Sequence, residues 1–384
     1  MPYGKALSLR LRRERRLSLS QARRRRSCQS RGRTHNLRRP PPPLDVSVGL
    51  GESQLGVVRT VADAFGGPRV SCVLATGPPG TGKTRTILGV AMELIRRGCG
   101  CGGGGPIMTR LLLVSRTNAA CDQIVSALLS LHTLLEVHDW GRRYLKSLSQ
   151  AFGSVAGARM PVLLRVGQAP PKGDPIAATH IDAVVKDLLP RVYPDVVRRQ
   201  EAAAAAHEAL LQSLGASGSN DPTSVRDAQA AGDELVEANA AVKKSVRRLH
   251  SQVAQGAPIV VTTTATSTGN AIGDLGYHVI IVDEAASTSI PAAVSAVVRA
   301  AGEGGDEAAR MTRCVVFTGD PAQLPPSSGM RYTGDLIAMG DSVFERLQRD
   351  HPQLTLTHQH RLRPIFWTIV RGLFYSSIPV GAGM

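Results

Sequence analysis

Residues 71–97, "SCVLATGPPGTGKTRTILGVAMELIRR", decide the fold class of this chain. The stretch reads as an apolar strand, a Gly-rich loop and a helix. The loop, residues 77–84, has the spacing G-x-x-x-x-G-K-[ST], and the preceding strand and following helix are the context that this phosphate-binding motif requires. The sequence therefore predicts a nucleotide-phosphate site here, and this context disfavours the alternative of a Gly-rich turn without a ligand.

The residue types of the loop suit a nucleoside triphosphate. Gly80 and Gly82 carry no side chains, so backbone N–H groups can close around phosphate oxygens at a helix N-terminus. Lys83 is expected to neutralise the β- and γ-phosphates of ATP, and the Thr84 hydroxyl to ligate Mg²⁺. The predicted nucleotide-binding set in the loop is Gly77, Pro78, Pro79, Gly80, Thr81, Gly82, Lys83, Thr84 and Arg85. ATP and Mg²⁺ are the predicted cofactors.

Four further segments contain an apolar strand that ends in a polar loop. They are residues 109–129, 257–268, 277–288 and 312–326. Strands that are apolar throughout and separated by helices indicate a parallel sheet buried on both faces. We therefore predict an α/β fold with a mostly parallel sheet flanked by helices, and ligands at the carboxyl ends of its strands.

Two of these loops carry groups suited to phosphoryl transfer. In "VIIVDEAAS", Asp283 is placed to hold Mg²⁺ through water, and Glu284 to orient and deprotonate the attacking water. In "FTGDPAQLPP", Gln323 is placed to hydrogen-bond the γ-phosphate or that water. Either loop alone could be an ordinary solvated turn. Their order after a phosphate loop favours the catalytic interpretation.

The positive charge of the chain is concentrated at its N-terminus. Of the net charge of +16, residues 1–39 supply +13, from 14 Lys and Arg against the single acid Glu14, and the remainder supplies +3. The basic balance is therefore no argument that the folded body binds nucleic acid. The segment 1–45 is rich in Arg, Ser and Pro, and we predict that it is disordered.

Three interpretations of this N-terminal segment stay open. The run 23–26 is typical of a nuclear-localisation or nucleic-acid-binding arm, and the Arg- and Ser-rich, acid-poor composition is typical of a mitochondrial transit peptide. The third interpretation is an extension without function, or a start site placed too early. We expect an intracellular protein, with the nucleus or cytoplasm favoured and the mitochondrion as the alternative.

The spacing of the cysteines and the length of the apolar runs predict neither a zinc site nor a membrane-spanning helix. Cys99 and Cys101 are the only close pair among the six cysteines, and no second pair stands at zinc spacing, so we expect reduced thiols and no zinc site. No run approaches the roughly 18 apolar residues that a membrane helix needs, so no membrane contact is expected.

Residues 131–255 interrupt the strand pattern with helical sequence. Ala228, Leu235, Val242 and Leu249 repeat every seven residues, which is the seam pattern of a coiled coil. Val225, Val246 and Val253 lie on the adjoining stripe, with Gly232 and Asn239 as weak points. The linker "GASGSNDP" suggests an antiparallel hairpin that projects from the body. A surface helix pair that packs on the body is the alternative.

At this point the chain resembles superfamily 1 helicases, in the branch that contains the nonsense-mediated-decay helicase and senataxin. The residues that carry the resemblance occur in the family's order: "GPPGTGKT", "DEAAS", "GDPAQLPP", "SVFERL" (342–347) and "QHRLRP" (359–364). The resemblance covers about residues 46–375, apart from the helical insertion. It implies a RecA-like P-loop NTPase fold, and ATP hydrolysis coupled to translocation along single-stranded RNA or DNA.

The resemblance also implies roles for residues outside the phosphate loop. "LGESQ" (50–54) is similar to the family's adenine-reading segment, which makes Gln54 a predicted adenine contact, and His360 stands where the family has a Tyr that would stack on the adenine. The predicted nucleic-acid contacts are Thr117, Asn118, Thr263 and Thr264, whose hydroxyl and amide groups suit phosphate and sugar. Ser287 replaces a Gln and Gly51 an Asn of the family pattern, and neither change removes a group needed for Mg²⁺ or phosphate.

The resemblance implies a second RecA-like lobe, of which only the first strand and helix, about 354–376, are recognisable. ATP in these motors lies between two lobes, and closure completes the site. Arg361 could supply a catalytic charge there, but without the rest of its lobe we do not expect it to be positioned. A protein that supplies or regulates the second lobe is therefore a predicted partner, beside single-stranded RNA or DNA.

The predicted organisation has four parts. They are a tail (1–45), a RecA-like ATP-binding lobe (46–130 and 256–350), a helical stalk- or prong-like insertion (131–255) and the start of a truncated second lobe (351–384). The predicted activity is that of an ATP-dependent helicase core, with Lys83, Glu284, Gln323 and Arg361 as catalytic residues. Two alternatives stay open: a nucleotide-dependent nucleic-acid-binding or regulatory protein without unwinding activity, and another P-loop ATPase.

Overall fold

In a computed structural model of the chain, residues 44–384 form one compact unit. The structure describes residues 49–67, 69–100, 109–151, 161–171, 173–217, 222–269, 272, 275–301, 311–326, 341–376 and 381–382. The predictions for the Arg-rich segment 1–45 and for the Cys99–Cys101 pair fall on residues or side chains outside this description, and they stay predictions.

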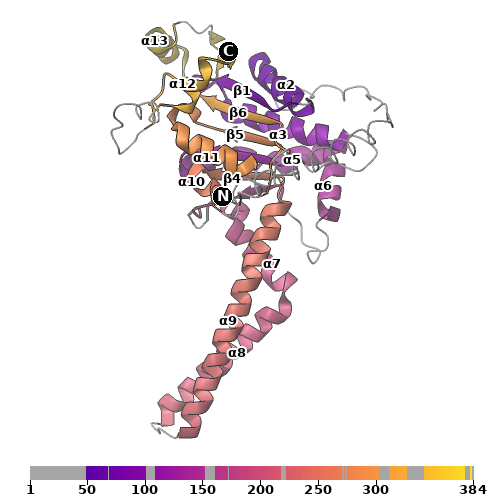
Figure 1. Cartoon of the computed structure of the whole chain (residues 1–384), viewed down its shortest axis with the longest axis vertical. Helices are drawn as coiled ribbons and strands as arrows, with labels where there is room; N and C mark the ends of the chain where they lie inside the picture. Colours follow the sequence, from indigo (N-terminus) through magenta and orange to yellow (C-terminus); the bar gives the residue numbers. More distant parts are fainter. Residues whose placement is uncertain are drawn as a thin grey trace, which may run out of the picture. The chain divides into compact units, whose positions relative to one another are not determined.

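A seven-stranded sheet forms the centre of the unit, in the order β3-β4-β2-β5-β6-β1-β7 (Figure 1). Its strands are β1 (Ser71–Thr76), β2 (Leu111–Ser115), β3 (Leu163–Arg165), β4 (Ile259–Thr263), β5 (Val279–Val282), β6 (Cys314–Gly319) and β7 (Gln353–Thr355). Every pairing in this sheet is parallel. This confirms the predicted α/β class and its parallel sheet.

Both faces of the sheet are buried, because alternate side chains of each strand enter two different apolar clusters. Along β2, Leu111 and Leu113 belong to one cluster, and Leu112 and Val114 to the other. β5 alternates in the same way. This explains why the strands are apolar throughout, as expected for a parallel sheet covered by helices on both sides.

The helices cover the two faces in sequence order. One face packs against α2 (Glu52–Gly66), α3 (Lys83–Gly100), α4 (Asn118–Leu128), α5 (Leu131–Val137) and α6 (Asp139–Ala151). The other packs against α7 (Ile181–Val192), the end of α9 (Pro222–Gly256), α11 (Ile290–Ala301) and α12 (Val343–Gln348). Short elements follow the strands at their carboxyl ends, namely α10 (Thr264–Ser267) after β4 and η3 (Ala285–Ser287) after β5.

The predicted helical insertion at 131–255 requires a correction. Its first part belongs to the body of the unit, because α5 and α6 contribute buried side chains to the core and β3 pairs with β4 at the sheet edge. The apolar run "PVLLRV" (161–166) contains this strand, since a short run of this kind fits a buried strand. The 3₁₀ turn η2 (Pro175–Thr179) then leads into α7.

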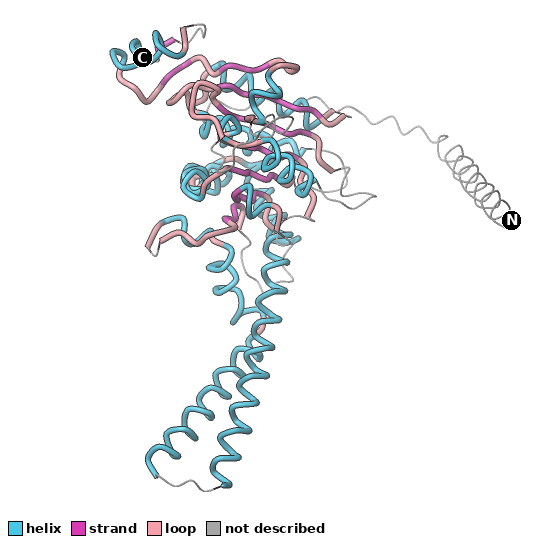
Figure 2. Tube along the Cα trace, turned by 60° about the vertical axis from the view of Figure 1, so that its left-hand side comes forward, coloured by secondary structure: helices cyan, strands magenta, loops and turns pink. Residues whose placement is uncertain are grey.

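Only α8 (Pro194–Ser217) and α9 form the projecting hairpin, and they lie side by side in both views (Figures 1 and 2). Ala228 and Leu249 of the predicted seam are buried, whereas Val225 is exposed. The predicted weak points have partners in α8: Gly232 faces the His207 ring, and the Gln200 amide donates to the Asn239 side-chain oxygen at 3.4 Å.

The C-terminal segment also requires a correction. The predicted second lobe was to begin at residue 351, yet β7 pairs with β1 and closes the edge of the first sheet. Leu356 continues into the core. Only β8 (His358–Gln359), which pairs with β9 (Gly381–Ala382), and α13 (Pro364–Phe374) stand apart from this sheet.

Among the residues that the structure describes, one helical stretch, Asn118–Val137, is long and apolar enough to cross a membrane by length and composition alone. This differs from the expectation that no run of the chain reaches that length. It is weak evidence, because a core helix of a soluble protein passes the same test, and Ile124, Leu128 and Leu131 of this stretch are packed in the core.

Candidate nucleotide-binding site

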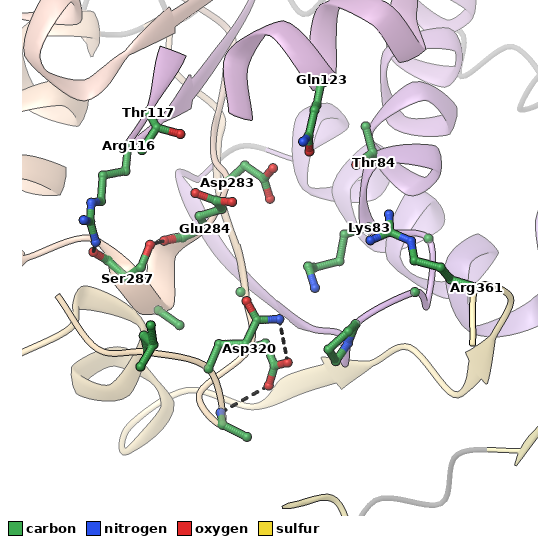
Figure 3. Close-up of a pocket in the computed structure, with 18 of the residues that line it drawn as sticks. Lys83, Thr84, Arg116, Thr117, Gln123, Asp283, Glu284, Ser287, Asp320 and Arg361 are labelled. Carbon is green, nitrogen blue, oxygen red and sulfur yellow. Dashed lines mark hydrogen bonds between the residues drawn. The ribbon is translucent and has the colours of Figure 1, made fainter. Parts of the chain in front are cut away.

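A cavity of ≈ 1130 Å³ lies at the carboxyl ends of β1, β2, β5 and β6 (Figure 3). Segments far apart in the sequence form it: the phosphate loop, the loops after β2, β5 and β6, and the turn that precedes α13. The residues predicted for phosphate, metal or catalysis that line it are Pro79, Gly80, Gly82, Lys83, Thr84, Arg85, Asp283, Glu284, Gln323 and Arg361. The parallel topology brings the phosphate loop and the loops after β2, β5 and β6 together, because all four follow the carboxyl ends of strands in one sheet.

The phosphate loop fits the group that it is predicted to hold. Gly80 and Gly82 have φ angles of 80° and 82°, which only glycine adopts without strain. A Cβ on Gly77 would lie 2.7 Å from the Thr81 hydroxyl and 2.9 Å from the Lys83 side chain. The loop is therefore a closed cradle of backbone, with α3 beginning at Lys83, and this is the arrangement that binds anions through N–H groups.

Lys83 is held in place by the loop itself. Its ammonium donates to the carbonyl of Gly77 at 2.5 Å and reaches that of Pro78 at 3.5 Å. Burial lowers the Lys83 pKa, and the Arg361 charge acts in the same direction, while Asp320, Asp283 and Glu284 oppose the shift. A bound phosphate would supply the counter-charge that this buried cation lacks at close range.

Asp283 and Glu284 follow β5 directly, and their side chains have different surroundings. Asp283 is buried and accepts a hydrogen bond from the Thr318 hydroxyl, and its backbone N–H donates to Val114 at 2.8 Å. Glu284 has a φ of 53°, the single positive φ of a non-glycine residue in the described part of the chain. Such left-handed geometry at a non-glycine residue is typical of functional turns. Burial and the Asp283 charge raise the Glu284 pKa, which favours a proton acceptor over an inert anion.

The carboxylate of Asp320 organises the loop after β6. It accepts from the Ala322 N–H at 3.1 Å and from the Gln323 amide at 3.0 Å. It also accepts from the Tyr375 hydroxyl at 2.7 Å, so the end of α13 is tied to this loop. Burial and the Asp320 carboxylate both raise the Tyr375 pKa, which keeps that phenol protonated as the donor.

Arg361 corrects an expectation from the sequence, because it is positioned at the cavity without the rest of a second lobe. The His360 backbone N–H donates to the Gly80 carbonyl at 2.9 Å, and the Gln359 side chain accepts from the backbone N–H groups of Arg361 and Leu362. A Cβ on Gly80 would lie 2.7 Å from the Arg361 Cβ. The segment "QHRLRP" therefore folds directly onto the phosphate loop.

In a comparison with known protein families, a family described as an AAA domain matches residues 50–328. The match covers more than half of the chain. The chain belongs to this AAA domain family. The matched residues contain the phosphate loop, the Asp283–Glu284 pair and the loop of Gln323, and they identify a P-loop ATPase domain, of a kind that generally binds ATP with Mg²⁺. Arg361 lies outside the match.

In this AAA domain, Gln54 lies behind the phosphate loop and is not among the residues that line the cavity. It is 3% exposed, its amide donates to the carbonyls of Thr81 at 3.1 Å and Gly82 at 3.4 Å, and its oxygen accepts from the Gly51 N–H at 2.8 Å. Its observed contacts therefore stabilise the loop. His360 is exposed and also outside the cavity lining. The adenine contacts of both residues stay predictions.

The four residues predicted to contact nucleic acid fall into two groups in the AAA domain. Thr117 is exposed and caps α4 by accepting from the Ala120 N–H at 3.2 Å, and the Asn118 amide beside it donates to Gln168 at 2.8 Å. Thr263 and Thr264 are buried instead. The Thr263 hydroxyl caps α10 through the Thr266 N–H. The structure therefore places only the first pair at the surface, and the role of all four stays a prediction.

Three residues with structural or site contacts carry no sequence motif, and only Arg116 among them lines the cavity. Arg116 lines the cavity and donates to the Ser287 carbonyl at 3.2 Å (Figure 3). Tyr375 holds Asp320, and Arg165 at the end of β3 is fully buried. No motif marks these residues. The one usable signal was an arginine inside the apolar run "PVLLRV", because a charge in a buried strand requires partners.

Proposed function

We propose that this AAA domain protein hydrolyses ATP and couples hydrolysis to translocation along single-stranded RNA or DNA, in the manner of superfamily 1 helicases of the decay-helicase and senataxin branch. One observation carries the proposal: the Asp283–Glu284 turn, Gln323 and Arg361 line the same cavity as the phosphate loop. A phosphate loop alone would fit many nucleotide-binding proteins. The added carboxylate pair, amide and guanidinium suit attack of water on a γ-phosphate.

Each side chain has a defined part in this proposal. Lys83 and the N–H groups of the loop bind the β- and γ-phosphates, and Arg361, which lies against Gly80 of that loop, adds a second positive charge. Glu284 accepts the proton of the attacking water, and Gln323, oriented by Asp320, positions that water or the γ-phosphate. Thr84 and Asp283 would hold Mg²⁺, which neutralises charge on the transferred phosphoryl group when bound.

A second RecA-like lobe is part of the proposal, in the same polypeptide or in another. The support is the outer face of α13, where Ile365, Phe366, Ile369, Leu373 and Phe374 are all more than half exposed. Five large apolar side chains on one helix of 11 residues form the kind of patch that packs against another domain. Closure of such a lobe over Arg361 would complete the ATP site.

A nucleotide-dependent nucleic-acid-binding protein without unwinding activity is the second candidate. It is favoured by the burial of Thr263 and Thr264, because buried hydroxyls cannot contact a nucleic-acid strand during translocation. In this case the cavity would act as a switch that alters nucleic-acid affinity, and hydrolysis would be slow.

The test measures ATP hydrolysis by the full chain with and without a single-stranded oligonucleotide, and strand separation of a tailed duplex. We expect hydrolysis that depends on Mg²⁺, rises with the oligonucleotide, and is lost in Glu284→Gln while nucleotide binding is kept. Hydrolysis that is unchanged in Glu284→Gln would refute the assigned base. Oligonucleotide binding that depends on nucleotide, with neither stimulated hydrolysis nor unwinding, would favour the second candidate.

A further inference from the structure

Arg165, the last residue of the edge strand β3, is 0% exposed. A buried guanidinium is costly unless its charge is paired and its N–H groups are satisfied. Here it donates through Nε to the Asp122 carboxylate at 2.9 Å, and through its two terminal nitrogens to the Asn118 oxygen at 2.9 Å and the Val166 carbonyl at 2.5 Å. Two of these three acceptors belong to α4, so Arg165 joins β3 to the start of that helix.

The loop after β3 is fixed from the inside by the same group. Gly167 has a φ of 132°, and a Cβ there would lie 2.9 Å from an Arg165 terminal nitrogen, so the chain passes directly against the guanidinium. His180, which is 2% exposed, places its Nε2 2.9 Å from the Gly167 carbonyl. Two buried polar side chains therefore set the position of the next residue, Gln168.

Gln168 is exposed and lies beside the predicted nucleic-acid contacts. Its oxygen accepts from the Asn118 amide at 2.8 Å, and its own amide N–H groups have no partner among the described residues. Thr117, adjacent to Asn118 in the chain, is exposed as well. The surface thus presents amide and hydroxyl groups in a fixed arrangement, which are the groups that contact phosphate and sugar without reading base sequence.

We propose that Gln168 is a further contact to the sugar-phosphate backbone of single-stranded nucleic acid, and that Arg165 is the positioning residue that holds Gln168 and Asn118 in one surface. The inference rests on the proposed function, since it names a part of the nucleic-acid site which that function requires. Arg165 itself touches no ligand. Its guanidinium acts through the Asn118 oxygen and the 166–168 loop.

The experiment measures the dissociation constants of fluorescein-labelled 20-mers of oligouridine and oligothymidine by anisotropy, with the full chain. Gln168→Ala is expected to weaken binding of both about 3- to 10-fold, as for the loss of one or two hydrogen bonds. Gln255→Ala is the matched control. That glutamine is also exposed and makes one side-chain hydrogen bond, to Ser251. It lies in the last turn of α9, before the amino end of β4, whereas Gln168 follows the carboxyl end of β3.

Arg165→Lys keeps the charge, but a lysine ammonium cannot reach all three acceptors. The substitution is expected to raise the dissociation constants of both oligonucleotides about 10-fold or more. The dissociation constant for a fluorescent ADP analogue with Mg²⁺ should stay within about two-fold, because none of the Arg165 partners lines the nucleotide cavity. Arg110→Lys is the matched control. It alters another largely buried arginine, at the other end of β2, that donates to the Leu275 and Ala254 carbonyls. It should lower stability without changing oligonucleotide binding.

A double-mutant cycle of Arg165→Lys and Gln168→Ala distinguishes a positioning role of Arg165 from a merely structural one. In the Arg165→Lys background, Gln168→Ala should cause little further loss, whereas independent roles would give additive losses. If Arg165→Lys does not fold, a cycle of Asn118→Ala and Gln168→Ala tests whether these two side chains bind as one surface, and additive losses there overturn the inference. Wild-type affinity in a folded Arg165→Lys or in Gln168→Ala also overturns it. A wild-type chain that binds neither oligonucleotide refutes the proposed function and this inference together.

Discussion

At the scale of single residues, the phosphate loop depends on glycines that serve both backbone geometry and packing. Gly82 combines a φ of 82° with a position where any Cβ would overlap the Gln54 amide nitrogen. Gln54 in turn donates to the carbonyls of Thr81 and Gly82. The loop and the start of α2 therefore form one locked unit, and a side chain at residue 82 would displace it.

Gly82→Ala is expected to abolish nucleotide binding and to lower the free energy of unfolding. The change adds the strain of a positive φ, about 1 kcal/mol, to a clash that the Gln54 amide must relieve by moving. Gly173→Ala is the control, because Gly173 has a φ of 88° but no atom within 4 Å of the point that a Cβ would occupy. Calorimetric titration with an ATP analogue and urea unfolding measure both effects. Equal behaviour of the two variants would contradict the proposed packing role of Gln54.

The sequence predicts those residues that stand in local motifs, and it does not reveal those that act through partners far away in the chain. Lys83, Asp283 and Gln323 stand in local motifs at strand ends, so their convergence follows once the sheet is known to be parallel. Arg165 and Tyr375 act through partners 43 and 55 residues away in the chain. Because such contacts depend on tertiary packing, spacing carries no trace of them. Thr263 and Thr264 failed to reach the surface for a local reason, since the chain turns into α10 immediately after β4.

At the scale of secondary-structure elements, α13 is attached to the ATP-binding lobe by polar contacts more than by apolar ones. Its inner side buries Trp367 and packs it against Tyr375, with ring centroids 5.9 Å apart, while its outer apolar side is exposed. The Tyr375–Asp320 hydrogen bond connects it to the loop of Gln323. A movement of α13 would therefore displace Asp320 and, through it, Gln323 in the cavity. A second lobe that contacts α13 could act on the γ-phosphate region in this way.

Tyr375→Phe is expected to lower the free energy of unfolding by about 1–2 kcal/mol, since it removes one buried hydrogen bond to a carboxylate and keeps the ring. It should also increase proteolysis within α13 relative to the rest of the unit. Urea unfolding and limited proteolysis followed by mass spectrometry measure the two effects. Thr357→Val is the control, because the Thr357 side chain hydrogen-bonds only the neighbouring His358 ring in the described part of the chain. A Tyr375→Phe chain as stable and as resistant as the wild type would show that the hydroxyl does not anchor α13.

At the scale of the whole compact unit, the sheet is one core with helices on both faces. Cys121 on α4 and Cys314 on β6 are fully buried. Burial raises the pKa of the Cys121 thiol to about 11 and that of Cys314 to about 12. Since only the thiolate reacts with alkylating agents, both thiols should be inert in the native protein near neutral pH. Partial burial also raises the pKa of the Cys72 thiol, but Cys72 on β1 is exposed and serves as the accessible reference.

Iodoacetamide at pH 8 is expected to modify Cys72 in the native protein and to spare Cys121 and Cys314 until urea unfolds the sheet. Both should then become reactive over one transition, because α4 and β6 pack into the same apolar cluster. Peptide mass spectrometry after pulse labelling resolves the three sites. Modification of Cys314 without denaturant, or separate transitions for Cys121 and Cys314, would contradict a single core.

The central question for the whole molecule is whether the cavity binds ATP through Lys83. Isothermal titration of the full chain with a non-hydrolysable ATP analogue and Mg²⁺ is the measurement, with Lys83→Ala as the variant. We predict one site in the wild type, and an affinity about 10- to 100-fold weaker in a folded Lys83→Ala chain, as for the loss of a charge-assisted hydrogen bond to phosphate. A folded wild type that binds no nucleotide, or equal affinities in the two chains, would contradict the assignment of this cavity as an ATP site.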